Sequence, residues 1–203
     1  EVASPYPKEI DSFENEDTYP DLDFVVTGMA KPLRLHRKIL ANTSGYFRIA
    51  LKEIRDLRLE WPYDTSKEVD KETLIKALRF CYGETLSVGI KNGECCAMIA
   101  ALTRLQVTCL YDAVMSLMEF AVEEAKRDIK AGVELLKVCV GYKECCESSG
   151  VALDKKLAAI VLTKENMKNH FKEVVDECLM MLPPDYLMVA EYGEPHTKYS
   201  VSQ

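Results

Sequence analysis

Apolar and polar residues alternate in the first third of the chain, with a spacing that predicts a small β-sheet. Residues 23–27 predict a short strand, and residues 31–35 predict its partner across a tight connection, so that the two form a hairpin. Leu and Trp alternate with charged residues over positions 57–61, which predicts a third strand. The expected sheet is therefore short and has few strands.

From His36 onward the apolar spacing becomes helical. Ile39 and Leu40 share one face of a first helix, and Ser44–Gly45 breaks it before a second short helix. Amphipathic patterns predict further helices over residues 71–82, 93–107, 109–125, 131–147, 152–164 and 169–182. The chain is thus expected to be α+β, with a small mixed sheet flanked by helices and then an all-helical extension.

Changes in composition predict four segments. Residues 1–20 combine acidic side chains with three prolines and are expected to form a disordered acidic tail. Residues 21–126 contain the predicted sheet and its helices, and residues 127–193 contain the helical extension. Residues 194–203 are expected to fray as a second tail.

Charge and hydropathy restrict the classes of partner. The net charge of −7 argues against a nucleic-acid surface, which needs clustered Lys and Arg to displace counterions from phosphates. No apolar run approaches the roughly 20 residues that span a bilayer, so no membrane association is expected. The chain begins at Glu1 without an initiator Met and is expected to be a fragment of a longer protein. Protein partners are the best expectation.

The eight cysteines are expected to be reduced thiols. Cys95–Cys96 and Cys145–Cys146 are adjacent pairs that bridge only with strain, and the chain has no C-x-x-C spacing that would grip zinc. We therefore expect no metal site and no cofactor. Reduced thiols fit a reducing compartment, which predicts a cytoplasmic protein, with the nucleus as the alternative.

Several of these motifs together resemble one family. An Asp-led strand at residues 23–26, His36–Arg37 at a helix start and Ser44-x-Tyr46–Phe47 at its end resemble the signature of BTB/POZ domains. Downstream, residues 78–83 and 100–107 resemble two later helices of that family. The resemblance covers roughly residues 20–125. The helices after residue 126 are similar in placement to the BACK-type extension that follows BTB domains in adaptor proteins.

The resemblance implies a protein–protein interaction module. In adaptor members the BTB fold binds a cullin scaffold of a ubiquitin ligase, while a region outside or after this chain would select the substrate. The cullin-binding element of the family, an apolar-x-Glu motif, is matched by Leu51-Lys52-Glu53 or by Ile54-Arg55-Asp56. The predicted partner-binding residues are therefore Leu51, Glu53, Ile54 and Asp56, together with Tyr111 at the start of a later helix.

A second branch of the family implies a different function. Transcriptional members dimerise and bind corepressor peptides in a charged groove, whose Asp and Arg match Asp23 and Arg37. The same two residues could instead form a buried pair that stabilises the fold. A corepressor-recruiting scaffold is therefore the alternative to the cullin adaptor.

The family resemblance also implies a homodimer. BTB dimers usually use an apolar helix before the first strand, and residues 1–20 lack a helical apolar stripe. We therefore expect a weak, concentration-dependent dimer, with a dissociation constant on the order of micromolar. The expected interface is one face of the first helices, formed by His36, Ile39, Thr43 and Tyr46.

No residue pattern predicts catalysis. His36 is expected either to cap a helix or to fill a hydrogen-bonding position in the core, because no G-x-S-x-G, H-E-x-x-H or comparable motif accompanies it. The remaining enzymatic alternative is a thiol enzyme that uses Cys81 or Cys109, which requires an exposed, electropositive setting. The chain is expected not to be an enzyme.

Overall fold

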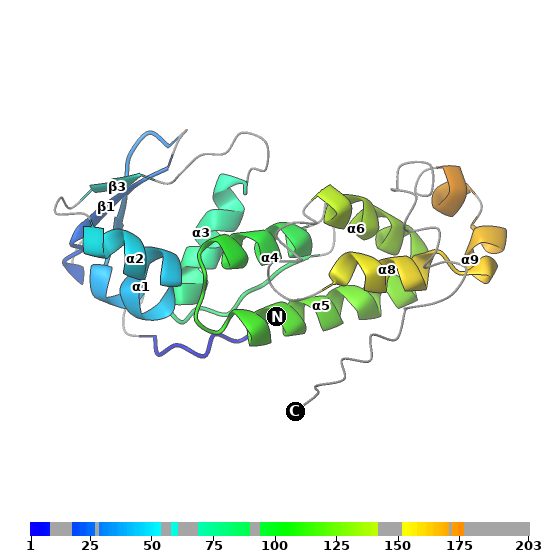
Figure 1. Cartoon of the computed structure of the whole chain (residues 1–203), viewed down its shortest axis with the longest axis horizontal. Coiled ribbons are helices and arrows are strands. Elements are labelled where there is room, and N and C mark those ends of the chain that lie inside the picture. The colour runs from blue at the N-terminus through cyan, green and yellow to red at the C-terminus, as the bar shows by residue number, and fades with distance from the viewer. Residues whose placement is uncertain are drawn as a thin grey trace, which may run out of the picture.

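A computed structural model describes residues 1–8, 18–26, 29–53, 58–60, 69–89, 94–141, 152–170 and 172–176 of the chain. The sheet and helices α1 and α2 lie at one end of the molecule, and α8 and α9 lie at the other (Figure 1). The long helix α5 runs from the middle toward the α9 end. The expected α+β fold, with a small sheet followed by helices, is confirmed.

The sheet has three strands in the order β2-β1-β3. The central strand β1 (Leu22–Val25) pairs antiparallel with β2 (Leu33–Leu35) and parallel with β3 (Arg58–Glu60). The sheet is therefore mixed, and the predicted hairpin is present. Leu22 and Phe24 point into the core, as the alternation of side chains along a strand requires.

The helices follow the predicted apolar periodicity. They are α1 (Arg37–Thr43), α2 (Gly45–Glu53), α3 (Lys71–Cys81), α4 (Glu94–Arg104), α5 (Leu110–Arg127), α6 (Ile129–Gly141), α8 (Leu153–Val161), α9 (Lys164–Asn169) and a π-helical turn, η3 (Lys172–Asp176). Helix α4 is buried at every position from Cys95 to Leu102, because apolar side chains occupy its whole circumference there.

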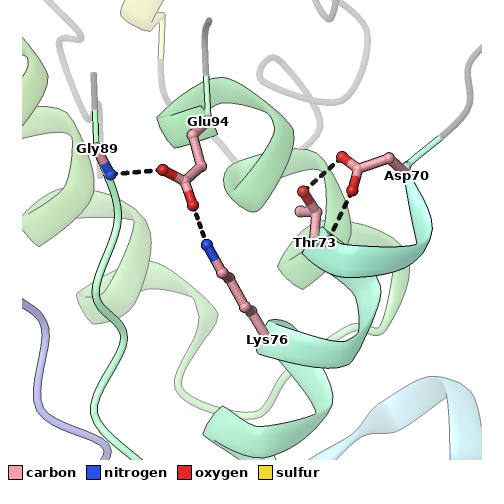
Figure 2. A network of polar contacts seen from close by, with 5 residues as sticks. All are labelled: Asp70, Thr73, Lys76, Gly89 and Glu94. Carbon is pink, nitrogen blue, oxygen red and sulfur yellow. Dashed lines mark hydrogen bonds and ion pairs between the residues drawn. The ribbon is translucent and has the colours of Figure 1, made fainter. Parts of the chain in front are cut away.

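Polar contacts cap the start of α3 and join the middle of α3 to the start of α4 (Figure 2). Asp70 caps α3 by accepting hydrogen bonds from the Thr73 amide and the Thr73 hydroxyl. Glu94, in the first turn of α4, pairs with Lys76 and accepts a hydrogen bond from the Gly89 amide at 2.7 Å. The two helices and the segment before α4 are thus held in one arrangement.

The helical extension packs on the domain as part of the same hydrophobic core. Helices α6 and α8 both contact α5, and the Cys96 thiol of α4 lies 3.9 Å from the Leu135 carbonyl oxygen of α6. A Cβ on Gly132 would lie 3.1 Å from both Ala125 Cβ and Val161 Cγ2. The small residues at this point let the three helices approach one another closely.

Residues 1–8 are ordered against the domain, which corrects the expectation of a disordered tail for this part of residues 1–20. Val2 and Leu86 exchange backbone hydrogen bonds of 2.9 and 2.8 Å, and the Ser4 hydroxyl donates to the Phe80 carbonyl oxygen. The Tyr6 ring packs edge-on against Phe80. The few apolar residues of the segment are sufficient to hold it in place, because the Leu86 backbone and the Phe80 ring are available as partners.

The remaining expectations about the termini fall on other residues. Positions 9–17 of the first expected tail, and the whole second tail at 194–203, lie outside the described residues. The same holds for residue 171 and for residues 177–182 of the last predicted helix, over 169–182. Helix α5 ends at Arg127 and α6 begins at Ile129, close to the predicted boundary between residues 126 and 127.

Candidate protein-interaction surface

His36 occupies a hydrogen-bonding position in the core. It precedes α1, and its backbone N–H donates to the Tyr82 hydroxyl at 2.8 Å. Its Nδ1 lies 3.1 Å from the same hydroxyl, and its Nε2 lies 3.0 Å from the Thr18 carbonyl oxygen. Burial raises the pKa of Tyr82, so the hydroxyl stays protonated. The imidazole thus connects the segment before β1 to the end of α3, a structural role.

Neither cysteine considered for thiol chemistry has the setting of a nucleophile. Cys81 is fully buried, and burial raises its pKa to about 12. Cys109 is half-buried, and burial also raises its pKa. A reactive thiol needs a lowered pKa and access to substrate. The geometry of these two residues therefore gives no support to the thiol-enzyme alternative.

The Ser44–Gly45 break fixes the start of α2 against the loop between α4 and α5. The buried Ser44 hydroxyl donates to the Leu105 carbonyl oxygen, and the Gly45 amide donates to the Gln106 carbonyl oxygen at 2.8 Å. A Cβ on Gly45 would lie 3.1 Å from Gln106 Cβ, so a larger residue would push the loop away. Ser44 and Gly45 thus supply two hydrogen bonds and one close approach to the loop.

The predicted partner-binding residues differ in their exposure to solvent. Leu51 is only 9% exposed and belongs to the core, whereas Tyr111, in the first turn of α5, is 64% exposed. Leu51 faces inward because it lies one helical turn after the fully buried Phe47. The side chain of Glu53 and the whole of Ile54 and Asp56 lie outside the described residues.

The exposed apolar residue of α2 is Ile49, which the sequence analysis did not single out. Its side chain is 58% exposed, and it lies two positions from both Phe47 and Leu51, on the opposite side of the helix. This two-residue spacing from Phe47 and Leu51 was the sequence signal that could have predicted an exposed Ile49. Among the described residues, the exposed large apolar side chains are Tyr19, Ile49 and Tyr111.

Ile49 and Tyr111 lie on helices that meet at the same loop. Helix α2 starts against residues 105–106, and that loop leads directly into α5. We refer to these two exposed side chains together as the Ile49–Tyr111 surface. Each has exposed charged neighbours in the sequence, Arg48 and Lys52 on α2 and Asp112 on α5. Exposed apolar residues beside charged ones are a usual composition of protein-binding surfaces.

A buried Asp23–Arg37 pair, one of the two roles considered for these residues, is not present between these two described side chains. Asp23 lies opposite Arg34 in the β1–β2 register, and the two side chains make a half-exposed ion pair at 3.0 Å. Arg37 instead donates its backbone N–H to Asp21 Oδ1 at 2.8 Å and its Nη2 to the Leu51 carbonyl oxygen at 3.2 Å. The strand register therefore gives Asp23 a different partner from the one expected.

The four residues expected to mediate self-association do not form one exposed patch. His36 and Thr43 are 9% and 5% exposed, because both point toward the core. Ile39 and Tyr46 are half-buried and pack against the core. A self-association surface on these helices would have to use other side chains.

Two properties of the described residues concern membrane insertion and metal binding. No helix there is both long and apolar enough to cross a membrane. No three His, Cys, Asp or Glu side chains in the described part of the chain gather in a way that could hold a metal ion. Cys81, Cys95, Cys96, Cys109 and Cys139 are free thiols, and the other three cysteines lie outside the described residues.

Comparison with known families gives one match. The BTB/POZ domain family matches residues 10–120, which is more than half of the chain. No curated protein is similar enough to the chain to count as a relative. The family match spans the sheet, helices α1 to α4 and the first part of α5, and it therefore includes the Ile49–Tyr111 surface. The chain belongs to the BTB/POZ domain family, whose domains are protein–protein interaction modules.

Proposed function

We propose that the chain is the scaffold-binding part of a substrate adaptor for a cullin-based ubiquitin ligase. The Ile49–Tyr111 surface supports this proposal, because it leaves two large apolar side chains in solvent on the helices that the family resemblance connects with cullin binding. Exposed apolar residues of this kind at a helix junction are typical anchors of a protein interface. The cullin would bind with its own apolar side chains against Ile49 and Tyr111.

The helical extension fits an adaptor. In this proposal α6, α8 and α9 form a BACK-type extension that spaces the cullin-binding surface from a substrate-selecting region outside or after the chain. The extension packs on α5 and forms one continuous core with the BTB domain, so the two parts would keep a fixed relative position. The protein would act in the cytoplasm or nucleus, where reduced thiols persist.

Self-association belongs to the same proposal. We expect a weak homodimer, because pairing two adaptors raises the effective concentration of each weak contact. Sedimentation velocity over a wide dilution series tests it. A monomer at the highest concentration reached, or a dimer that persists at nanomolar concentration, would contradict the expected dissociation constant on the order of micromolar.

The alternative function, a scaffold that recruits corepressor peptides, has less support. It depends on Asp23 and Arg37 acting together in one charged groove. The nearest polar partners of these two side chains are Arg34 and the Leu51 carbonyl oxygen, respectively. The adaptor is therefore the better-supported function.

Calorimetric titration with a cullin N-terminal region tests the adaptor proposal. Ile49→Ala and Tyr111→Ala should each weaken binding about tenfold or more, as expected for loss of an interface anchor. Tyr19→Ala is a matched control, because Tyr19 is 88% exposed and lies before β1, outside the two helices that carry Ile49 and Tyr111. Leu51→Ala is unsuitable as a probe of binding, since Leu51 is a core residue.

The possible results of this titration lead to different conclusions. No binding by the intact chain would remove the adaptor function. Binding that Tyr19→Ala weakens as much as Ile49→Ala would move the cullin site to another surface. Thermal unfolding of each variant must match that of the parent protein, because these side chains are exposed and their removal should change stability little.

A further inference from the structure

The stretch from β1 to the last residue but one of α2, between Asp23 and Glu53, has an unusual charge composition. Residues 24–52 contain six Lys and Arg residues and no Asp or Glu, although the whole chain has a net charge of −7. One of these cations, Arg34, is neutralised by Asp23. The others retain their charge within an acidic protein, so positive charge is concentrated locally on a molecule that is negative as a whole.

Two side-chain contacts show how α1 and α2 bring these cations together. Arg37 donates to the carbonyl oxygen of Leu51, and Arg48 Nε donates to the carbonyl oxygen of Ala41 at 3.1 Å. The start of α1 therefore lies beside the end of α2, and the end of α1 beside the middle of α2. This arrangement places Lys38, next to Arg37, at the same end of the helix pair as Lys52, next to Leu51.

Side-chain burial shows which face of the helix pair carries the charge. Lys38, Arg48 and Lys52 are exposed, while Leu40, Phe47 and Leu51 on the other side of the same helices are buried. Among the described residues, no acidic side chain pairs with any of these three cations. Ile49 lies among them on α2. We call Lys38, Arg48, Ile49 and Lys52 the basic face.

We propose that the basic face binds an acidic peptide segment of a partner protein, with an apolar side chain of that segment packed against Ile49. The proposal deepens the proposed function and rests on it, because it states the chemistry of the partner segment that contacts Ile49. Carboxylates on the segment would pair with Lys38, Arg48 and Lys52. The apolar contact would fix the register of the segment along the helices.

A peptide fits the basic face better than a nucleic acid does. At physiological salt, charges beyond about 8 Å are largely screened, so a short acidic segment that stays on the face feels mainly the local cations. A long nucleic acid would extend past the face over the rest of a chain whose net charge is negative. The exposed Ile49 also matches a peptide side chain and has no counterpart in phosphate recognition.

Fluorescence anisotropy with a labelled peptide tests the proposal without any cullin. The probe is a run of Glu residues with one central Leu, and its matched peptide has Ser in place of the Leu. The intact chain should bind the Leu probe more tightly than the Ser probe, and both should weaken as salt rises. The double variant Lys38→Glu/Lys52→Glu should weaken binding at least about tenfold, because attraction becomes repulsion at two positions.

The control changes the net charge by the same amount elsewhere. Lys155 and Lys156 are exposed on α8, so Lys155→Glu/Lys156→Glu should leave peptide binding nearly unchanged. Ile49→Ser should remove the preference for the Leu probe while keeping the salt dependence. Thermal unfolding of every variant shows whether a loss of binding is simply a loss of fold.

Other outcomes overturn either the peptide site or the adaptor function on which it rests. No peptide binding at low salt, or equal weakening by the α8 control, would show that the basic face is only a solvated surface. Tighter binding of duplex DNA or of anionic lipid vesicles than of the peptide would identify a general polyanion site. Failure to bind a cullin while peptide binding behaves as expected would remove the adaptor function and leave the peptide site in place.

Discussion

The BTB domain and its helical extension are held together in different ways. In the domain, side chains repeatedly bond to the backbone of distant segments, as Ser44 does to Leu105 and His36 to Thr18. In the described part of the extension, the long-range contacts are mostly apolar, and small residues such as Gly132 and Ala125 let helices pack closely. Within the described part of the extension, a long-range ion pair joins Lys130 to Glu173.

The two regions use different contacts because the domain must position irregular segments, whereas the described part of the extension consists mainly of helices. Irregular segments such as residues 1–8 and 105–109 have no apolar stripe, so single hydrogen bonds with one allowed geometry must fix them. Helices present continuous apolar stripes, and the shape of those stripes suffices to fix how they pack. The proposed Ile49–Tyr111 surface uses α2, whose start bonds to the loop at residues 105–106, and α5, which follows that loop. The relative placement of these two helices thus depends on a few polar contacts.

The largest expected effect tests whether the two regions fold as one. Leu136, on α6, is fully buried, and Leu136→Ala should lower the free energy of unfolding by about 2–5 kcal/mol, through lost burial and the cavity it leaves. Because α6 and α8 pack on α5 of the domain in one hydrophobic core, unfolding should remain a single transition. Urea denaturation followed by circular dichroism measures both quantities.

Glu134→Ala is the control for this change, since Glu134 is exposed on the same helix. It should alter stability by less than about 0.5 kcal/mol. Two separate unfolding transitions in Leu136→Ala would mean that the extension folds independently, and the idea of one shared core would be abandoned.

The second effect concerns the polar junction of the domain. Ser44→Ala should lower the free energy of unfolding by about 1–3 kcal/mol, because it leaves the buried Leu105 carbonyl and Phe47 amide without the Ser44 hydroxyl. Hydrogen exchange should also become faster in residues 105–109. Ser116→Ala is matched to it, since the exposed Ser116 hydroxyl bonds only within its own helix. Equal effects of the two changes would contradict the role given to the junction.

A smaller effect is expected where residues 1–8 cross the domain. Gly83 has φ +91°, and a Cβ there would lie 2.8 Å from the Tyr6 carbonyl oxygen. Gly83→Ala should lower the free energy of unfolding by about 1–2 kcal/mol and expose the segment to protease. Gly89→Ala is the comparison, because Gly89 does not share the positive φ. Unchanged proteolysis would mean that the segment is held by other contacts.

The smallest effect is that of the helix cap at Asp70. Burial raises the pKa of Asp70, but hydrogen bonds from the Thr73 hydroxyl and amide outweigh it and lower the pKa below the usual 3.8. A lowered folded-state pKa gives stability that is present above the unfolded-state pKa and is lost as pH falls through the folded-state pKa. Asp70→Ala should therefore cost about 1 kcal/mol at neutral pH, measured by urea denaturation.

Asp70→Asn sharpens this test, because Asn caps a helix without a charge. Its stability should match that of the parent protein near neutral pH and should exceed it when the pH falls below the usual carboxyl pKa. A parent protein and Asp70→Asn variant with the same pH profile would show that the Asp70 charge contributes nothing.

The sequence by itself determined the secondary structure and the class of fold. Alternation along a strand and helical spacing are local patterns, so the β1–β2 hairpin, the Ser44–Gly45 break and the amphipathic helices could be predicted from residues close together in the chain. The motifs at His36 and Tyr46–Phe47 were also sufficient to indicate the BTB/POZ family, which the comparison confirmed.

Only the tertiary structure decided which side chains meet and which remain exposed. Strand register paired Asp23 with Arg34 in place of Arg37, and the rotation of α2 buried Leu51 and exposed Ile49. Residues 1–8 found partners more than seventy positions away in the chain. Register, helix rotation and long-range partners depend on how whole elements pack. No pattern within one element encodes them, because each is set by the surface of another element.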